Sequence, residues 1–210
     1  MCAKFAITIA RQYGSGGRFI GKKLSEDLGV DFYDKELIQI ASKKSGVGEE
    51  FFAEDDEKKR WWLLGNLSAF SATIFGYEND NKNLMVSDSI FKIQSDIIRG
   101  LARKDSAIFV GRAADYVLRM HQRLVSVFIC ADEADRIERV CKYANLNEVQ
   151  AVKEIERNDK ERRRYYNHYT GKFWGHADSY DLCVNSSILG IDKTVSLIKD
   201  FAKQKFKNED

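Results

Sequence analysis

Hydrophobic residues along the chain form short continuous runs, separated by longer segments in which they recur every three or four positions. The longer runs cover residues 5–10, 106–110, 124–130 and 180–185, and a shorter one covers 31–33. Continuous apolar runs of this length, rich in β-branched residues, are typical of parallel strands covered on both faces. Short strands that alternate with helices predict an α/β fold with a parallel sheet of about five strands and helices on both faces.

Apolar positions at helical spacing predict the helices between these strands. Positions 20, 24 and 28 repeat after a glycine cluster, and Gly29 follows where a C-cap is expected. Similar patterns predict helices over residues 90–101, 134–141 and 191–202. Asn147 and Gln150 have the spacing of a capping box that begins one more helix.

Two segments depart from this alternation. Residues 49–77 hold a charged run at 54–60, which favours a solvated helical face, followed by Trp61 and Trp62. The tryptophans favour packing in the core, with an oligomer interface, such as that of a homodimer, as the alternative. Residues 159–180 are basic and aromatic, a mixture also found in proteins that bind single-stranded nucleic acid.

Charge and composition argue against several classes of function. The 34 basic and 32 acidic residues leave a net charge of +2, which argues against a nucleic-acid binder. No run approaches the ~20 apolar residues of a membrane helix, and the first residues lead into a glycine loop without a cleavage site, so we expect a cytoplasmic protein. The cysteines form no Cys-x-x-Cys pair and the histidines have no zinc spacing, which predicts reduced thiols and no protein-bound metal: Cys2, Cys130, Cys141, Cys183, His121, His168 and His176.

The most informative segment is a glycine cluster, Gly14-Ser15-Gly16-Gly17, between the first strand and the first helix. Glycines at such a turn let backbone N–H groups point to one place, and the helix adds the positive end of its dipole, so a phosphate is the expected ligand. A turn that serves only tight packing is the alternative.

The Walker A pattern fits this cluster only in part. With Gly16 as its second glycine, Gly17 and Arg18 occupy the positions of the lysine and of the hydroxyl residue. Arg11, Arg18 and Lys22 are nearby cations that could supply the missing charge.

Four pieces of the chain together resemble a known family. They are the loop Arg11-Gln12-Tyr13-Gly14-Ser15-Gly16-Gly17-Arg18, Asp34 after the second strand, Gly111-Arg112 at a later strand end, and the basic segment 157–164. Their order is similar to that of the cytidylate kinase-like branch of the P-loop nucleoside monophosphate kinases. The resemblance implies one P-loop NTP hydrolase-like three-layer domain over residues 1–210, with an acceptor-binding excursion at 49–85 and a lid at 157–178.

The same resemblance assigns roles to single residues. It implies that Gly14, Ser15, Gly16 and Gly17 hold the donor phosphates, and that Asp34 and Arg112 lie near the acceptor. Ala113 stands where the family motif has an aspartate. For Asp34, the N-cap of a helix beginning at Lys35 is a further reading, and for Arg112 a surface ion pair is the alternative.

The resemblance also implies that arginines of the basic segment reach both nucleotides. Arg157, Glu161 and Arg164 fall at i, i+4 and i+7, so a helix would place them on one face, with Glu161 toward the acceptor. Arg157, Arg162 and Arg164 would neutralise the charge on the transferring group, to which one arginine can contribute on the order of 10³–10⁵ in rate. A solvated helix with internal ion pairs is the alternative.

These observations predict ATP-dependent phosphoryl transfer to a small acceptor, most consistent with a nucleoside monophosphate such as CMP or dCMP. Arg18 or Lys22 would replace the Walker lysine, and Mg²⁺ would arrive with ATP, held mostly by phosphates and water. Because the lysine and the hydroxyl are both missing, the alternative is a regulatory protein that binds nucleotide without turnover.

Overall fold

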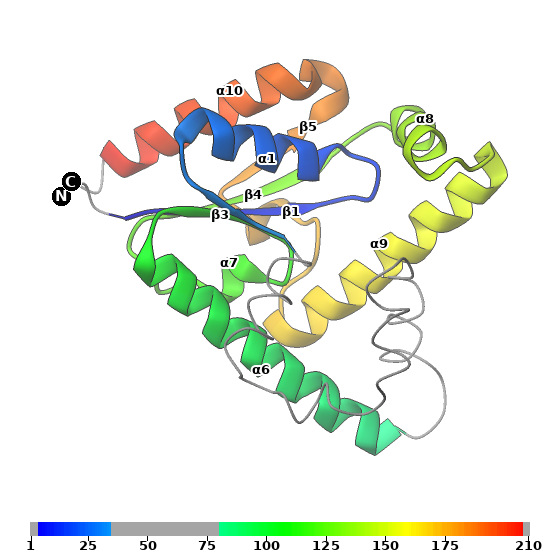
Figure 1. Ribbon diagram of the computed structural model, residues 1–210. Coiled ribbons are helices and arrows are strands. Elements are labelled where there is room, and N and C mark those ends of the chain that lie inside the picture. Colours follow the sequence, from blue (N-terminus) through cyan, green and yellow to red (C-terminus); the bar gives the residue numbers. More distant parts are fainter. Residues whose placement is uncertain (1–3, 35–79, 208–210) are drawn as a thin grey trace. The chain divides into compact units, whose positions relative to one another are not determined.

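A five-stranded parallel sheet forms the centre of the computed structural model, which describes residues 4–34 and 80–207 (Figure 1). The strand order is β2-β3-β1-β4-β5, and every adjacent pair is parallel. The strands are β1 (Ala6–Arg11), β2 (Asp31–Tyr33), β3 (Ala107–Val110), β4 (Leu124–Cys130) and β5 (Leu182–Asn185). The predicted α/β fold is therefore confirmed, and β4 coincides with the predicted run.

The chain divides into two compact units, of which the first comprises residues 1–36 and 98–210 and contains the whole sheet. The second comprises residues 37–97, and only 80–97 of it are described. Trp61, Trp62 and the acceptor-binding excursion predicted at 49–85 lie outside the described residues, apart from 80–85. The homodimer that the tryptophans would support stays a prediction.

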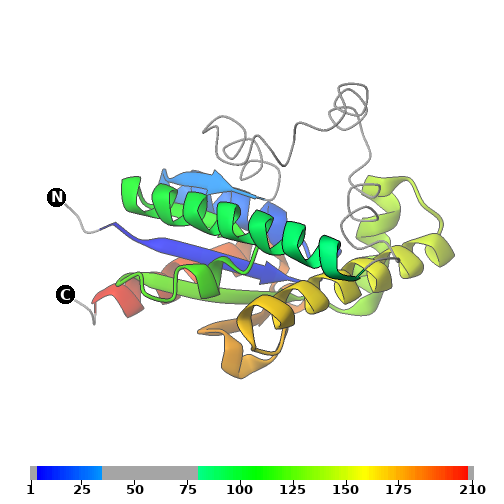
Figure 2. The same cartoon turned by 90° about the horizontal axis from the view of Figure 1, so that it is seen from below.

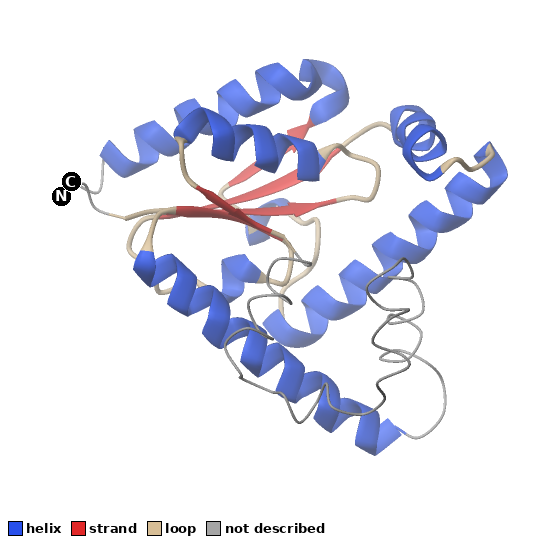
Figure 3. Cartoon of the chain, viewed as in Figure 1, coloured by secondary structure: helices blue, strands red, loops and turns tan. Residues whose placement is uncertain are grey.

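Six α-helices and one 3₁₀ turn are described (Figure 3). They are α1 (Gly17–Leu28), α6 (Asp80–Lys104), α7 (Ala114–Val117), α8 (Glu133–Ala144), α9 (Glu148–Thr170), α10 (Ser186–Lys207) and the 3₁₀ turn Ala177–Ser179. The helices predicted from apolar spacing are confirmed, whereas α7 has no counterpart in the prediction. The capping box is also confirmed, because Asn147 Oδ1 accepts from Gln150 N at 2.9 Å and Gln150 Oε1 accepts from Asn147 N at 3.1 Å.

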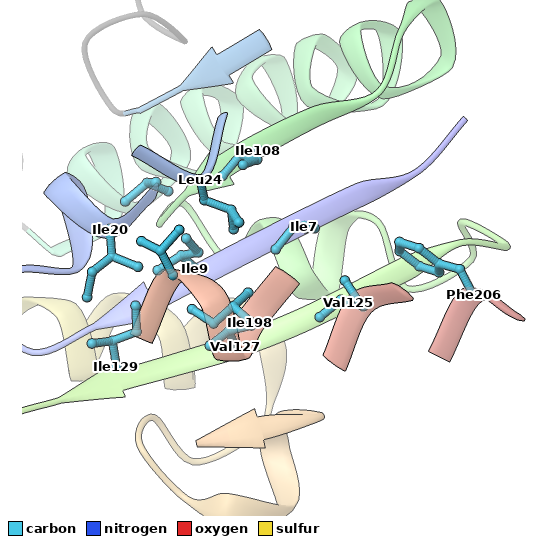
Figure 4. Close-up of a cluster of buried hydrophobic side chains, with 13 residues drawn as sticks. Ile7, Ile9, Ile20, Leu24, Ile108, Val125, Val127, Ile129, Ile198 and Phe206 are labelled. Carbon is cyan, nitrogen blue, oxygen red and sulfur yellow. The ribbon is translucent and has the colours of Figure 1, made fainter. Parts of the chain in front are cut away.

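Helices α1 and α10 cover one face of the sheet, and α7 lies on the other (Figures 1 and 2). Alternate residues of the central strands point toward α1 and α10, where Ile7, Ile9 and Val127 are completely buried (Figure 4). Since the strands are covered on both faces, their sequences read as continuous apolar runs instead of alternating ones.

An aromatic cluster packs on the opposite face and holds the segment that follows α9. The ring of Phe128 on β4 lies 5.2 Å from that of Trp174 and 5.1 Å from that of Tyr180. Tyr166, near the end of α9, packs at 5.8 Å from Tyr180 and is buried. The end of α9 is therefore fixed against the sheet.

The described residues bear on two sequence predictions, one about the cysteines and one about membrane-spanning helices. Cys130, Cys141 and Cys183 are free, as expected, while Cys2 is outside the described ranges. Burial raises the pKa of the Cys130 and Cys183 thiols, which disfavours the reactive thiolate. Within residues 4–34 and 80–207, no helix has the length and apolar character needed to cross a bilayer.

Candidate functional site

The glycine loop follows the central strand β1 and leads directly into α1. Gly14 and Gly16 have φ values of +80° and +76°, and Gly16 is the N-cap of α1. A Cβ at Gly14 would lie 2.8 Å from the carbonyl oxygen of Arg136, and one at Gly16 would lie 2.6 Å from Ile191 Cδ1. The conformation therefore favours glycine at both positions, and at Gly14 the main chain of Arg136 also leaves no space for a Cβ.

The carbonyl groups of the loop are occupied by the protein itself. The Gln12 carbonyl accepts from Ser15 Oγ at 2.8 Å, the Tyr13 carbonyl from Arg136 Nε at 2.7 Å, and the Ser15 carbonyl from Ser186 Oγ at 2.7 Å. Because Ser15 uses its hydroxyl to close the turn, that group is already engaged.

The N–H groups of the loop are in the opposite situation. Within the described part of the chain, no acceptor bonds the N–H of Gly14, Gly16 or Gly17. The first intrahelical bond of α1 runs from Ile20 N to Gly16 O at 3.0 Å, so the Gly17 amide at the start of the helix is left for a ligand. Free amides at a helix N-terminus bind anions, which favours a phosphate at this position.

Four arginines gather beside these amides. Burial lowers the pKa of Arg11 well below its usual value; Arg162, Arg112 and Arg18 lower it further, and Asp34 raises it. Arg162 on α9 also donates from Nη1 to the Arg11 carbonyl at 2.9 Å. Three guanidinium groups and one carboxylate, that of Asp34, thus act most strongly on Arg11. A bound anion would reduce the repulsion among the guanidinium groups.

Arg18 points to the side of the loop where β2 ends. Its Nε donates to Asp34 Oδ2 at 2.8 Å, and Asp34 is buried, whereas the Arg18 side chain is 57% exposed. Arg18 therefore sits between the phosphate loop and the carboxylate predicted to face the acceptor. The helix for which Asp34 could be the N-cap begins at Lys35, outside the described residues.

Arg112 is held by a strained turn at the end of β3. Gly111, Arg112 and Ala113 have consecutive φ values of +83°, +59° and +50°. For non-glycine residues this conformation costs on the order of 1 kcal/mol each, and such strain is typical of functional sites. The turn places the Arg112 guanidinium 5.4 Å from the ring centroid of Tyr165 on α9 and within electrostatic reach of Arg11.

The structure does not bring every predicted site residue to this cluster. Lys22 is exposed on α1 with its Nζ 4.0 Å from Glu26 Oε1, and its role in place of the Walker lysine stays a prediction. Arg157 is exposed and donates to Glu154 Oε1 at 2.7 Å, Arg164 is exposed, and Glu161 is half-buried. The side of α9 that meets the loop instead carries Asp159 and Arg162, because residues three apart share a helix face.

Sequence reasoning missed Arg136 and Asp159, which contact the loop directly. Asp159 Oδ1 accepts from Tyr13 N at 2.7 Å, and Asp159 also pairs with Arg136, whose Nε bonds the Tyr13 carbonyl. Both lie in charged helical segments, and their sequence surroundings do not distinguish them from exposed residues. The sequence did offer one signal: Asp159 lies three residues before Arg162, a spacing that places both on the same face of a helix.

A model of the cytidylate kinase-like family matches residues 6–188, from β1 through the glycine loop, the Arg112 turn and α9. This chain belongs to the cytidylate kinase-like family. The resemblance predicted from the loop and its companion segments is confirmed, and membership of a kinase family supports phosphoryl transfer as the class of reaction.

Solved structures share the fold of this family member at low identity. An uncharacterized protein from Eubacterium ventriosum ATCC 27560 has a TM-score of 0.72 at 24% identity, covering 95% of this chain and 99% of its own. TT1252 from Thermus thermophilus has a TM-score of 0.56 at 14% identity, covering 95% and 97%. A shikimate kinase from Bacteroides thetaiotaomicron has a TM-score of 0.55 at 11% identity, covering 96% and 99%. Among curated proteins, none matches.

P-loop kinases generally use ATP with Mg²⁺, and the loop fits the triphosphate of such a donor through its free N–H groups. The described residues contain no cluster of three or more His, Cys, Asp or Glu side chains suited to a metal. Arg18 also stands where a hydroxyl ligand of Mg²⁺ is expected. The ion would therefore be held mainly by phosphate oxygens and water, as Mg²⁺ often is.

Proposed function

We propose that this cytidylate kinase-like protein transfers a phosphoryl group from ATP to a small anionic acceptor, with CMP or dCMP as the first candidates. One observation carries the proposal: the free amides of Gly14, Gly16 and Gly17 lie beside a group of arginines that exceeds its nearby carboxylate in charge. Such an arrangement favours a polyanion over a neutral ligand.

In the proposed reaction, the loop amides hold the donor phosphates, and Arg11 and Arg162 supply the charge that a Walker lysine otherwise provides. An acceptor oxygen forms a bond to the γ-phosphorus while the bond from that phosphorus to the β–γ bridging oxygen breaks, and ADP leaves. Phosphoryl transfer depends mainly on positioning and charge neutralisation, so fixed guanidinium groups are suited to it.

The acceptor is proposed to lie over the ends of β2 and β3, between Asp34 and Arg112. Arg112 would meet the acceptor phosphate, and Asp34 would accept hydrogen bonds from its hydroxyl or amino groups. Arg18, which bonds Asp34, would touch both substrates. Arg157 and Arg164 are exposed and would join the transferring group only when α9 closes over it.

A second candidate function is a regulatory protein that binds nucleotide without turnover. It is favoured by Gly17 at the lysine position and by the ion pair between Arg18 and Asp34, which engages one cation of the loop. This candidate and the kinase differ in one measurable quantity, the acceptor-dependent release of ADP.

The test is a turnover assay with ATP, Mg²⁺ and a panel of CMP, dCMP, UMP, AMP and GMP, with shikimate as a non-nucleotide acceptor. We expect ADP release that requires CMP or dCMP, with the matching diphosphate detected by ³¹P NMR. Arg162→Gln should lower kcat/KM by about tenfold or more, because charge-assisted contacts to phosphate are strong. Lys142→Gln, an exposed cation of α8 paired with Glu138, is the matched control and should leave the rate unchanged.

The outcomes separate the candidates. Binding of ATP without ADP release for any acceptor contradicts the kinase and supports the regulatory protein. Release with shikimate alone keeps phosphoryl transfer and contradicts the nucleotide acceptor.

A further inference from the structure

A buried ion pair holds Tyr13 of the phosphate loop through both of its backbone polar groups. The Tyr13 N–H donates to Asp159 Oδ1 at 2.7 Å, and the Tyr13 carbonyl accepts from Arg136 Nε at 2.7 Å. Arg136 Nη2 also bonds Asp159 Oδ2, so the Tyr13 backbone and the two side chains close a ring. Asp159 and Arg136 are only 9% and 8% exposed.

Net stabilisation alone does not explain a pair in this place. Burying two charges costs desolvation that their attraction often only offsets, so a buried ion pair is weak evidence of a contribution to stability. This pair, however, makes two of its hydrogen bonds to the backbone of one loop residue. Its members come from different helices, α8 and α9, so Tyr13 is the point at which three segments meet.

The position of Tyr13 determines that of the amides that follow. Gly14 is the next residue, and its left-handed conformation brings it against the main chain of α8, where Arg136 O leaves no room for a Cβ. Arg139 donates from Nη1 to the Gly14 carbonyl at 3.2 Å. The direction of the Gly14 N–H therefore depends on where α8 holds the loop.

Helix α9 contacts the same loop at a second point. Arg162, three residues after Asp159, bonds the Arg11 carbonyl at 2.9 Å, and its guanidinium lies 5.2 Å from the Tyr13 ring centroid. On its other side the Tyr13 ring packs against Tyr143 of α8, with centroids 5.9 Å apart. A shift of α9 would consequently move the loop peptides on both sides of Gln12.

We propose that Asp159 and Arg136 are positioning residues that couple the conformation of the phosphate loop to α9. An anion on the loop amides then stabilises one position of α9, and with it the position of Arg162. The proposal rests on the proposed function only in assuming that the loop binds phosphates.

The experiment measures binding of inorganic triphosphate to the full-length chain, by thermal shift and by amide exchange. In the parent, triphosphate should slow exchange in both the loop and residues 155–166. Asp159→Asn keeps the shape of the side chain but removes its charge, and it should weaken triphosphate binding by roughly tenfold or more, as expected for the loss of a charge-assisted hydrogen bond. It should also abolish the effect of triphosphate on α9. In turnover, KM for ATP should rise more than kcat falls.

Two further variants make the test specific. Arg136→Lys retains the charge but cannot bond the Tyr13 carbonyl and Asp159 in the same way, so it should recover only part of the coupling. Lys142→Gln breaks an ion pair of α8 that does not touch the loop, and it should bind triphosphate like the parent. If Asp159→Asn does not fold, Arg136→Lys still provides the measurement.

Failure of this proposal is distinguishable from failure of the proposed function. If Asp159→Asn binds triphosphate as tightly as the parent and α9 still gains protection, the coupling is wrong and the kinase assignment stands. If the parent shows the coupling but transfers no phosphoryl group to any acceptor, the coupling stands and the kinase assignment is wrong.

Discussion

Gly16 depends on glycine mainly through its backbone conformation. Its φ of +76° is strained for any residue with a side chain, and an added Cβ would also displace the end of the Ile191 side chain on α10. The N–H of Gly16 is also one of the free donors. A substitution here therefore acts on the shape of the anion site before it acts on its chemistry.

Gly16→Val should abolish the thermal stabilisation by ATP, which follows RT ln(1 + [L]/Kd) and amounts to about 2.7 kcal/mol at a hundredfold excess over Kd in the parent. The matched control is Gly29→Ala at the other end of α1, where φ is +62° and nothing lies within 4 Å of an added Cβ. It should cost about 1 kcal/mol of stability from backbone strain yet keep the full ATP shift. An equal ATP shift in Gly16→Val and the parent would mean that the loop has a structural role only.

The residue scale also shows where sequence reasoning stops. The glycine turn and the strand-end positions of Asp34 and Arg112 could be predicted because turns and strand ends have local signatures. The contact of Asp159 with the loop could not, because its partner Arg136 is on another helix and its burial depends on how α8 and α9 pack. The role of Lys22 stays a prediction: it is close to the loop in sequence, and in the structure its Nζ lies near Glu26.

At the scale of elements, α7 and α9 are joined by a buried carboxyl. Tyr166 Oη donates to Asp115 Oδ2 at 2.7 Å, and Asp115 lies in the first turn of its short helix, which directly follows the strained Arg112 turn. Burial raises the pKa of Asp115, and the hydrogen bond from Tyr166 opposes this only in part. The bond thus ties the end of α9 to the segment that presents Arg112.

A raised pKa in the folded state means that the folded chain prefers protonated Asp115. Its contribution to stability is fully present below the ordinary aspartate pKa of about 3.9 and is lost as pH rises through the folded value. Asp115→Asn, which resembles the neutral carboxyl, should therefore gain stability relative to the parent as pH rises from 4 to 8. Urea midpoints across this range provide the measurement.

Tyr166→Phe is the companion variant, and it should cost about 1–3 kcal/mol because it leaves a buried acceptor without its donor. If Asp115→Asn instead gained stability relative to the parent as the pH falls, the predicted direction of the pH dependence would be wrong.

Helix α9 illustrates which part of an element can be predicted. The start of α9 could be predicted from sequence, because the capping box at Asn147 is a local signal that the structure reproduces. The face of α9 that contacts the loop could not be predicted, because the charges at 157, 161 and 164 also form a stripe at helical spacing and pointed to another face. Packing determines that face instead, because Asp159 and Tyr166 are buried together with Ala151 and Ile155, whereas Arg157 and Arg164 are exposed.

At the scale of the whole molecule, the lid at 157–178 stays a prediction, and the structure allows a more specific test of it. Residues 157–164 should exchange amide hydrogens more slowly when an ATP analogue and CMP are bound together than when either is absent. The segment 179–180, just beyond the lid, should be protected in all states, because Ser179 and Tyr180 are buried and their N–H groups donate to backbone carbonyls. This second segment is the internal reference, and equal exchange of 157–164 in every state would argue against a lid.

The architecture could be predicted more completely than the site. Strand runs and helical spacing are properties of neighbouring residues, and a parallel sheet with crossovers follows from their alternation. The arginine cluster instead joins the ends of β1 and β3, the start of α1, and the middle of α9, so it exists only after the fold has formed.

The order of the strands has a consequence for synthesis of the chain on the ribosome. β1 is made first, yet Ala6 pairs with Ala107 of β3 and Leu124 of β4, which emerge more than a hundred residues later. At about 5–20 residues per second, β1 waits roughly 6–25 s for its partners. Through that interval a strand of apolar, β-branched residues has two unpaired edges, the situation in which nascent chains aggregate or recruit chaperones.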